Sequence, residues 1–147
     1  MKYYSYEAFK KDTNSLIKQV KDSEIDVIIG IARGGLSLAH AMAEGMEIRN
    51  VQSIRTELYD GTKKRENLSI FDTTLLRNAK RVLVVDDIAD SGETLEAVMR
   101  HLEKEYTDIK FLSATLFYKK TSVYKPHFWI NEATEWIEFF WEKDFSE

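Results

Sequence analysis

The most chemically informative segment of this 147-residue chain is residues 82–94, with the sequence VLVVDDIADSGET. An apolar run characteristic of a buried strand ends in two adjacent carboxylates, Asp86 and Asp87, and a third acid, Asp90, follows three residues later. A helix is predicted next, and its first N–H groups would bind a phosphate because they are unpaired and lie at the positive end of the helix dipole. These groups belong to Ser91, Gly92, Glu93 and Thr94.

The same carboxylates are placed to accept hydrogen bonds from the vicinal hydroxyls of a sugar, so the segment predicts a site for a ribose 5-phosphate. The structural alternative is an ordinary strand, turn and helix in which Asp90 or Ser91 acts only as the N-cap. That alternative accounts for the turn, but it leaves two adjacent acids at the end of a strand unexplained.

The segment resembles the signature with which type I phosphoribosyltransferases bind phosphoribosyl pyrophosphate (PRPP): an apolar strand, two acids, two apolar residues, then a polar turn with Gly and Thr. The resemblance implies that Asp86 and Asp87 contact the ribose hydroxyls and the water ligands of Mg²⁺, while residues 91–94 hold the 5-phosphate. Family members that act on 6-oxopurines usually carry an acid at the position of Asp90. There it faces N7 of the base as general acid or base, so Asp90 is the predicted catalytic residue.

A second polar turn, Arg33, Gly34 and Gly35, follows the β-branched run at residues 27–31. Taken alone, these residues fit a tight turn with an exposed arginine equally well. Within the resemblance they match the pyrophosphate-binding loop, whose N–H groups and guanidinium would neutralise the leaving pyrophosphate. In relatives the peptide bond that enters this arginine, here Ala32–Arg33, is often cis.

The C-terminal segment carries the residues expected to recognise the base. By register, Lys119 rather than Lys120 matches the lysine that reads the 6-oxo group, although a solvent-facing lysine pair is the structural alternative. The resemblance places the ring of Trp136 on the purine and the backbone carbonyl of Ile137 at the C2 substituent; core packing or a dimer contact would also explain the tryptophan. Glu142 matches an acid that can ligate a second Mg²⁺ in relatives.

Residues 59–67 form a charged segment with one glycine, and they match the position of the flexible loop that closes over the site in this family. Purine-specific members often have Ser-Tyr where this chain has Leu58 and Tyr59, which removes the serine contact but keeps Tyr59 as the expected lid residue. A solvated hairpin tip is the alternative, and the two descriptions are compatible.

Apolar periodicity predicts helices near residues 6–20, 36–46 and after 94, and strands near 27–31, 51–58, 81–85, 111–117 and 128–130. Strands that alternate with helices predict an α/β fold, a parallel twisted sheet flanked by helices. The resemblance implies the type I phosphoribosyltransferase fold, as a single domain over residues 1–147 with a small hood over about 119–147.

Composition excludes several other classes of site. The chain has no cysteine, so disulfides and thiolate metal sites are excluded, and the spacing of its three histidines does not suit zinc. A net charge of −4 argues against nucleic acid as a partner. Because no apolar run is long enough to span a membrane, we expect a cytoplasmic protein without a membrane partner.

Together these features predict a Mg²⁺-dependent purine salvage enzyme that joins guanine, xanthine or hypoxanthine to PRPP, forming a nucleoside 5'-monophosphate and pyrophosphate. The resemblance is strongest to bacterial xanthine-guanine phosphoribosyltransferases and implies a homodimer or homotetramer. A non-catalytic sensor of PRPP or nucleotides on the same fold is an alternative. A receiver-type domain, which also begins with an apolar strand and two acids, leaves the Ser-Gly-Glu-Thr turn unexplained.

Overall fold

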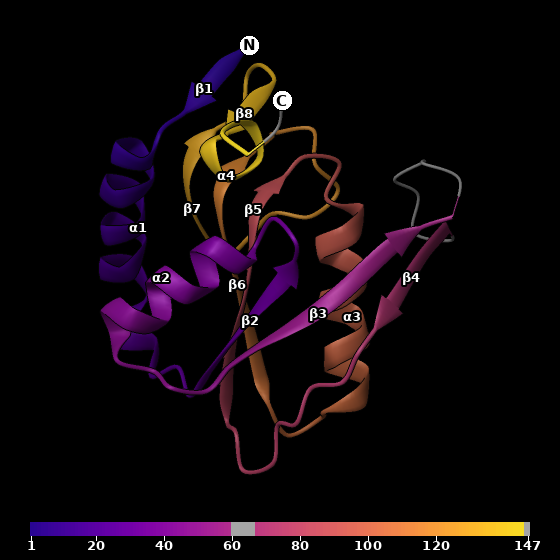
Figure 1. The fold of residues 1–147 in the computed structure, drawn as a ribbon. Helices are drawn as coiled ribbons and strands as arrows, with labels where there is room; N and C mark the ends of the chain where they lie inside the picture. The colour runs from indigo at the N-terminus through magenta and orange to yellow at the C-terminus, as the bar shows by residue number, and fades with distance from the viewer. Residues whose placement is uncertain (60–66, 146–147) are drawn as a thin grey trace.

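The computed structural model describes residues 1–59 and 67–145, and a six-stranded sheet with the order β4-β3-β2-β5-β6-β7 forms its centre (Figure 1). Neighbouring strands are parallel except for β3 and β4, so the predicted parallel sheet is confirmed, with one antiparallel pair at its edge. The elements in chain order are β1 (Lys2–Tyr4), α1 (Tyr6–Val20), η1 (Lys21–Ser23), β2 (Val27–Ala32), α2 (Leu36–Met46), β3 (Val51–Leu58), β4 (Leu68–Phe71), β5 (Arg81–Ala89), α3 (Glu93–Glu105), β6 (Lys110–Tyr118), β7 (Phe128–Glu132), β8 (Ile137–Phe139) and α4 (Phe140–Lys143).

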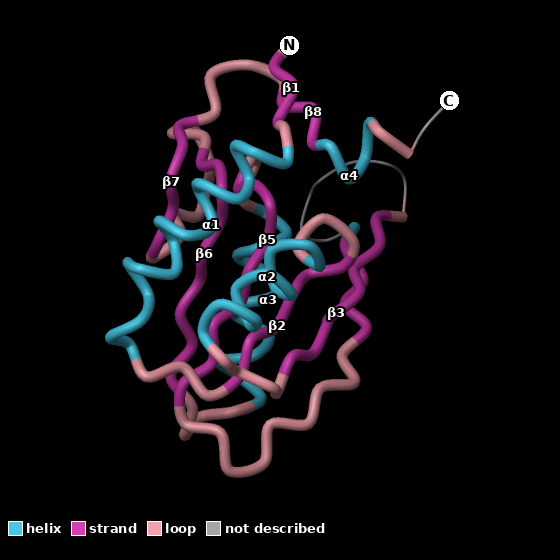
Figure 2. The backbone as a smooth tube through the Cα atoms, turned by 60° about the vertical axis from the view of Figure 1, so that its left-hand side comes forward, coloured by secondary structure: helices cyan, strands magenta, loops and turns pink. Residues whose placement is uncertain are grey.

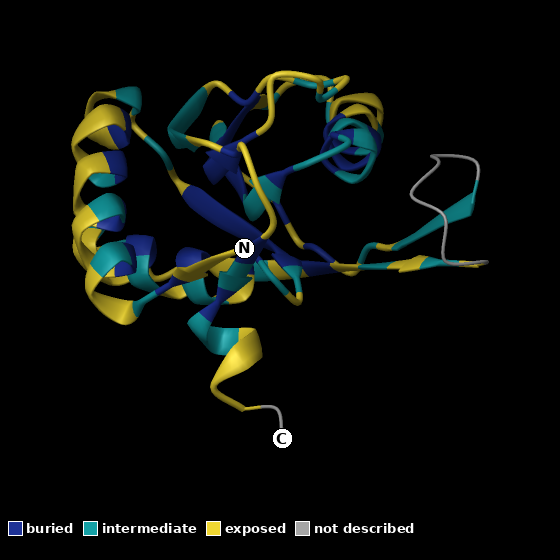
Figure 3. Ribbon diagram, turned by 90° about the horizontal axis from the view of Figure 1, so that it is seen from above, coloured by how far each residue is buried: buried dark blue, intermediate teal, exposed yellow. Residues whose placement is uncertain are grey.

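The helices cover both faces of the sheet, and each face has its own apolar core. Helices α1 and α2 pack on one face, where the core includes Leu83 and Val85 of β5. Helix α3 packs on the other face, where it covers Val82 and Val84. In the view from above, the buried strands lie between α1 and α3 (Figure 3). Burial on both faces explains why β5 appears in the sequence as an uninterrupted apolar run.

The helix predictions are confirmed. The predicted amphipathic helix at residues 6–20 is α1, and the predicted apolar stripe of α3 is fully buried. The predicted end of β5 was wrong, because the strand continues through Asp86 and Asp87 to Ala89. Its pairing with β6 persists up to Ala89 opposite Tyr118, and these ladder hydrogen bonds hold the acids within the strand rather than after it.

A second, two-stranded sheet forms above the ends of the central strands, where β1 pairs in parallel with β8 (Figure 2). We call β1 together with residues 133–143, which include β8 and α4, the hood. β7 belongs to the main sheet, and the N-terminal β1 supplies the partner strand of β8. The ring of Tyr4 anchors β1, packing edge-on against Phe117 and Phe139 with centroids 5.0 and 5.6 Å away.

None of the helices in residues 1–59 and 67–145 combines the length and hydrophobicity needed to cross a lipid bilayer.

Candidate active site

Two adjoining cavities open at the carboxyl ends of the central strands, where ligands bind in parallel α/β sheets. The first has a volume of about 700 Å³ and lies between the loops that follow β2 and β5, with α4 above it. The second, about 330 Å³, lies under the hood, between the ends of β5 and β6 and residues 133–137. Both cavities are lined by Asp87, Ile88, Asp90 and Glu142, which therefore form a shared wall.

The loop after β2 supplies one side of the first cavity. The Ala32–Arg33 peptide bond is cis, and Arg33 and Gly34 line the cavity. A Cβ atom on Gly34 would lie 2.7 Å from Cγ of Asp87, so a larger residue here would force this carboxylate or the loop to shift. Gly35 does not line the cavity. Its N–H donates to the carbonyl of Ile31 (2.8 Å) and is therefore committed to the loop itself.

The acid pair at the end of β5 lies between the two polar loops. Oδ1 of Asp86 accepts the N–H of Asp87 (2.9 Å), and Oδ1 of Asp87 accepts the N–H of Ile88 (2.7 Å). Burial raises the pKa of Asp87 to about 6; an interaction with Asp86 opposes this rise, and the nearby charge of Glu142 adds to it. The structure thus gathers negative charge that a cation would stabilise.

The donor set suits Mg²⁺ only in combination with substrate oxygens. Among the described residues, no group of three or more acidic, histidine or cysteine side chains is arranged to hold a metal. Mg²⁺ is commonly bound by one or two carboxylates together with water and substrate phosphates. Asp86, Asp87 and Glu142, all lining the first cavity, are the residues that fit this arrangement.

The turn before α3 forms the opposite side of the first cavity. Ser91, Gly92 and Thr94 line the cavity, whereas Glu93 does not, and its N–H already donates to Oγ of Ser91 (3.3 Å). Gly92 caps α3 with φ of 82°, a left-handed conformation that favours glycine. A Cβ atom there would lie 2.8 Å from the backbone nitrogen of Tyr124, so the glycine is required by the protein's own packing as well.

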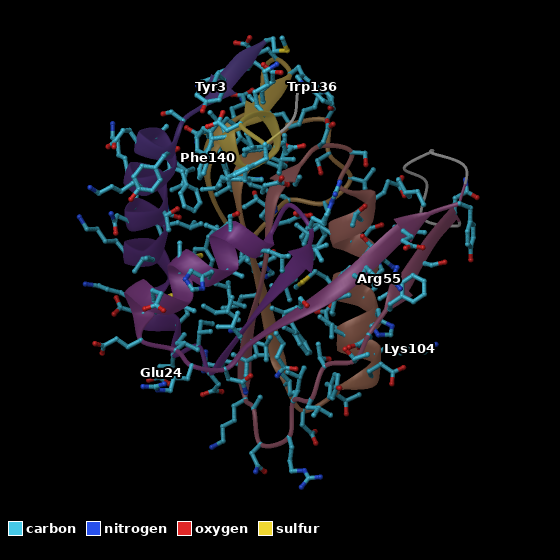
Figure 4. The ribbon with its side chains drawn as sticks, in the orientation of Figure 1. Tyr3, Glu24, Arg55, Lys104, Trp136 and Phe140 are labelled. Carbon is cyan, nitrogen blue, oxygen red and sulfur yellow. The ribbon has the colours of Figure 1, made fainter. Side chains whose placement is uncertain are left out.

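The second cavity brings together all the residues expected to recognise a base. Lys119 and Asp90 both line this cavity, and Nζ of Lys119 lies 3.6 Å from Oδ1 of Asp90. Trp136 is 67% exposed at the hood (Figure 4), and it lines the cavity together with buried Ile137. The N–H of Lys2 donates to the carbonyl of Trp136 (2.8 Å). Because peptide groups alternate in direction along a strand, the next carbonyl, that of Ile137, points away from β1.

The structure brings neither of the two described residues of the expected lid, Tyr59 and Asn67, into a cavity. Tyr59 is exposed and donates its N–H to the carbonyl of Asn67 (2.9 Å). Residues 60–66 of the predicted lid lie outside the described residues.

Several lining residues were not predicted from the sequence: Ser37, Thr56 and Leu58 in the first cavity, and Ala133, Thr134 and Glu135 in the second. Ser37 lies in the first turn of α2, directly after the glycine loop, and its place at the start of a helix that follows a strand is a signal that the sequence does contain. The other residues belong to no recognisable motif, because the tertiary structure brings their segments to the cavities from elsewhere in the chain.

The parallel sheet, its two polar loops and the acid pair between them define a phosphoribosyltransferase fold. The family model of the phosphoribosyl transferase domain matches residues 2–145, and the chain belongs to this family. The resemblance inferred from the motifs and the predicted fold class are thereby confirmed.

Individual relatives cover nearly the whole chain. The structure of the xanthine-guanine-hypoxanthine phosphoribosyltransferase of Helicobacter pylori is 41% identical, with a TM-score of 0.90 over 97% of this chain and 94% of that one. The purine phosphoribosyltransferase of Pyrococcus horikoshii is 27% identical, with a TM-score of 0.82 over 97% and 93% of the two chains. A xanthine-guanine phosphoribosyltransferase of Idiomarina loihiensis is 28% identical over 95% of this chain and 86% of its own.

Proposed function

We propose that this protein is a Mg²⁺-dependent phosphoribosyltransferase that joins guanine, xanthine or hypoxanthine to PRPP, producing a nucleoside 5'-monophosphate and pyrophosphate. The observation that carries the proposal is the second cavity, where Asp90, Lys119 and Trp136 meet beside the predicted PRPP site. The names of the relatives, all phosphoribosyltransferases of purines, support a role in purine salvage.

In this proposal PRPP occupies the first cavity. The hydroxyls of Ser91 and Thr94 and the backbone N–H groups of this turn bind the 5-phosphate, at the positive end of α3. Asp86 and Asp87 accept hydrogen bonds from the ribose hydroxyls. Arg33 lines the first cavity on the side opposite the turn before α3, and it stabilises the charge of the departing pyrophosphate. Asp86, Asp87 and Glu142 would hold Mg²⁺, which would supply positive charge to offset that of the pyrophosphate.

The base occupies the second cavity, where its N9 replaces pyrophosphate on C1 of the ribose. N7 and the 6-oxo group are neighbours on one edge of the purine, which matches the proximity of Asp90 and Lys119. Lys119 donates to the 6-oxo group, and Asp90 accepts the N7 proton as the N9–C1 bond forms. The ring of Trp136 stacks on the base, and the carbonyl of Ile137 faces the C2 substituent.

The direct test is pyrophosphate release from PRPP with a panel of bases. We expect turnover with at least one of guanine, xanthine and hypoxanthine, and little with adenine, orotate or uracil. A preference for one of the latter three would refute the 6-oxopurine assignment. PRPP binding without turnover of any base would instead support the sensor alternative.

The metal requirement is tested in the same assay. Because Asp86, Asp87 and Glu142 line one cavity, and Mg²⁺ is commonly bound by carboxylates together with substrate phosphates, we expect a chelator to abolish turnover and added Mg²⁺ to restore it. Full activity after exhaustive chelation would contradict the proposed cofactor. The family resemblance also supports a single domain, a homodimer or homotetramer and a cytoplasmic location; sedimentation analysis would test the assembly.

A further inference from the structure

Residues 119–127, between β6 and β7, form a segment that we call the strap. It begins at Lys119, which lines the second cavity, and turns back toward the first cavity. Its bends are held by internal hydrogen bonds. The N–H of Ser122 donates to the carbonyl of Lys119 (2.9 Å), and Oγ of Ser122 donates to the carbonyl of Tyr124 (2.7 Å). These bonds make the strap a defined unit rather than a loose connection.

Two backbone hydrogen bonds join the strap to the residues that flank Asp90. The N–H of Lys119 donates to the carbonyl of Ala89 (3.0 Å), and the N–H of Val123 donates to the carbonyl of Ser91 (2.8 Å). The strap therefore holds the proposed catalytic acid from both sides, and it connects the lysine of one cavity to the phosphate-binding turn of the other.

Contact at Gly92 makes this connection stiff. A Cβ atom on Gly92 would lie 2.8 Å from the backbone nitrogen of Tyr124 and 3.1 Å from that of Val123. The backbone of the strap therefore packs against the turn without space for an intervening atom. Because packed segments move together, displacement of the strap would displace the turn that caps α3.

The strap is anchored to β6 of the main sheet by a cluster that we call the latch, namely Ser113, Tyr124 and His127. Ser113 is fully buried in β6, and its Oγ lies 3.2 Å from the hydroxyl of Tyr124 and 2.9 Å from Nδ1 of His127. The N–H of His127 also donates to this Oγ (3.2 Å), while the N–H of Ser113 donates to Nδ1 (3.1 Å). Oγ of Ser113 thus has three hydrogen-bond partners, which matches the one donor and two acceptor positions of a hydroxyl.

The latch lines neither cavity, so any effect it has on ligands must act through the strap. We infer that Ser113, Tyr124 and His127 are positioning residues that set the spacing between the base and phosphate cavities, an inference that rests on the proposed function for the identity of the ligands. A ligand that spans both cavities requires this spacing, whereas a fragment that fills only one does not.

The first test uses the protein without ligand. Tyr124→Phe removes only the hydroxyl that contacts Ser113, so the protein should stay folded while amide hydrogen exchange at Ser122 and Val123 accelerates about fivefold, as expected for one lost hydrogen bond. Tyr106→Phe is the matched control, because its hydroxyl bonds the carbonyl of Thr74 (3.4 Å), away from the strap. Unchanged exchange in Tyr124→Phe would overturn the inference.

The second test compares three ligands by calorimetry: guanine, ribose 5-phosphate and guanosine 5'-monophosphate. In Tyr124→Phe we expect the nucleotide to bind about fivefold more weakly, with each fragment changed by less than about twofold, because only the nucleotide senses the spacing. Equal weakening of all three would indicate a merely structural role and overturn the inference. If wild type binds ribose 5-phosphate but neither purine ligand, the proposed base is wrong, and the exchange measurement still decides the role of the latch.

Discussion

The two cavities are built in different ways. The first is formed mainly by two contiguous segments, residues 31–37 and 86–95, each running from a strand through a polar turn into a helix. The second is assembled from the ends of β5 and β6 and from the hood, whose β8 is held by the N-terminal β1. The proposed phosphate site is therefore encoded locally, because one turn would supply most of its donors, whereas the proposed base site depends on contacts between distant segments.

The largest expected effect concerns the wall that the cavities share. Asp90→Asn keeps the size of the side chain but cannot accept the N7 proton, so turnover of the preferred purine should fall about 100- to 10,000-fold. Ribose 5-phosphate, which fills the first cavity only, should bind as in wild type. Full turnover in steady-state assays of this variant would remove Asp90 from the chemistry.

Substitution of Trp136 tests whether the hood contributes only to base binding and not to PRPP binding. Trp136→Ala should weaken guanine binding by about 1–3 kcal/mol through lost stacking, as measured by calorimetry, while PRPP affinity is unchanged. Trp136→Phe keeps an aromatic face and should recover much of the loss. If PRPP binding weakened as much as base binding, Trp136 would have a structural role instead.

Lys119 and Lys120 form a matched pair that separates base recognition from surface charge. Lys119→Ala should weaken guanine binding about tenfold, since a charge-assisted hydrogen bond to the 6-oxo group is lost. Lys120→Ala should have no measurable effect, because this exposed lysine lines neither cavity and its pairing with Glu132 (3.7 Å) lies at the surface. Equal effects in a titration would contradict the predicted register.

The smallest expected effect lies outside both cavities, at Asp72. Burial acts to raise the pKa of this carboxyl, but hydrogen bonds from Thr74 and His101 outweigh it and hold the pKa below its usual value. A carboxyl with a lower pKa in the folded protein stabilises it above the unfolded pKa, and this stabilisation is lost as the pH falls through the folded pKa.

Asp72→Asn should therefore lower the free energy of unfolding at neutral pH by about 1 kcal/mol and make the difference from wild type shrink under acidic conditions. Urea denaturation across acidic and neutral pH measures this difference. A constant gap at all pH values would show that the ionised form of Asp72 is not the source of its stabilisation.

Much of the fold could be predicted from local pattern. Helices α1 and α3 followed from one-sided apolar stripes, and β5 followed from an apolar run that ends in two acids. The sequence did not indicate that β5 continues to Ala89, because this depends on pairing with β6. Nor did it indicate β1, since a three-residue strand is stabilised only by its partner β8, far along the chain.

The site residues divide in the same way, into those indicated by local sequence and those that depend on distant segments. Ser91, Gly92 and Thr94 could be predicted because a helix start after a strand has a recognisable chemistry. Residues of the second cavity such as Thr134 and Glu135 could not, because no local pattern distinguishes them from other hood residues. Gly35 and Glu93, which were also expected at the site, line neither cavity, and their backbone N–H groups form hydrogen bonds within the loops.

The central claim is that the two cavities hold the two halves of one nucleotide. A crystal structure with guanosine 5'-monophosphate tests it most directly. The account predicts the phosphate against residues 91–94, the purine between Lys119 and Trp136, and N7 facing Asp90. A phosphate in the predicted position with the purine outside the second cavity, or a phosphate bound at Arg33 instead, would contradict it.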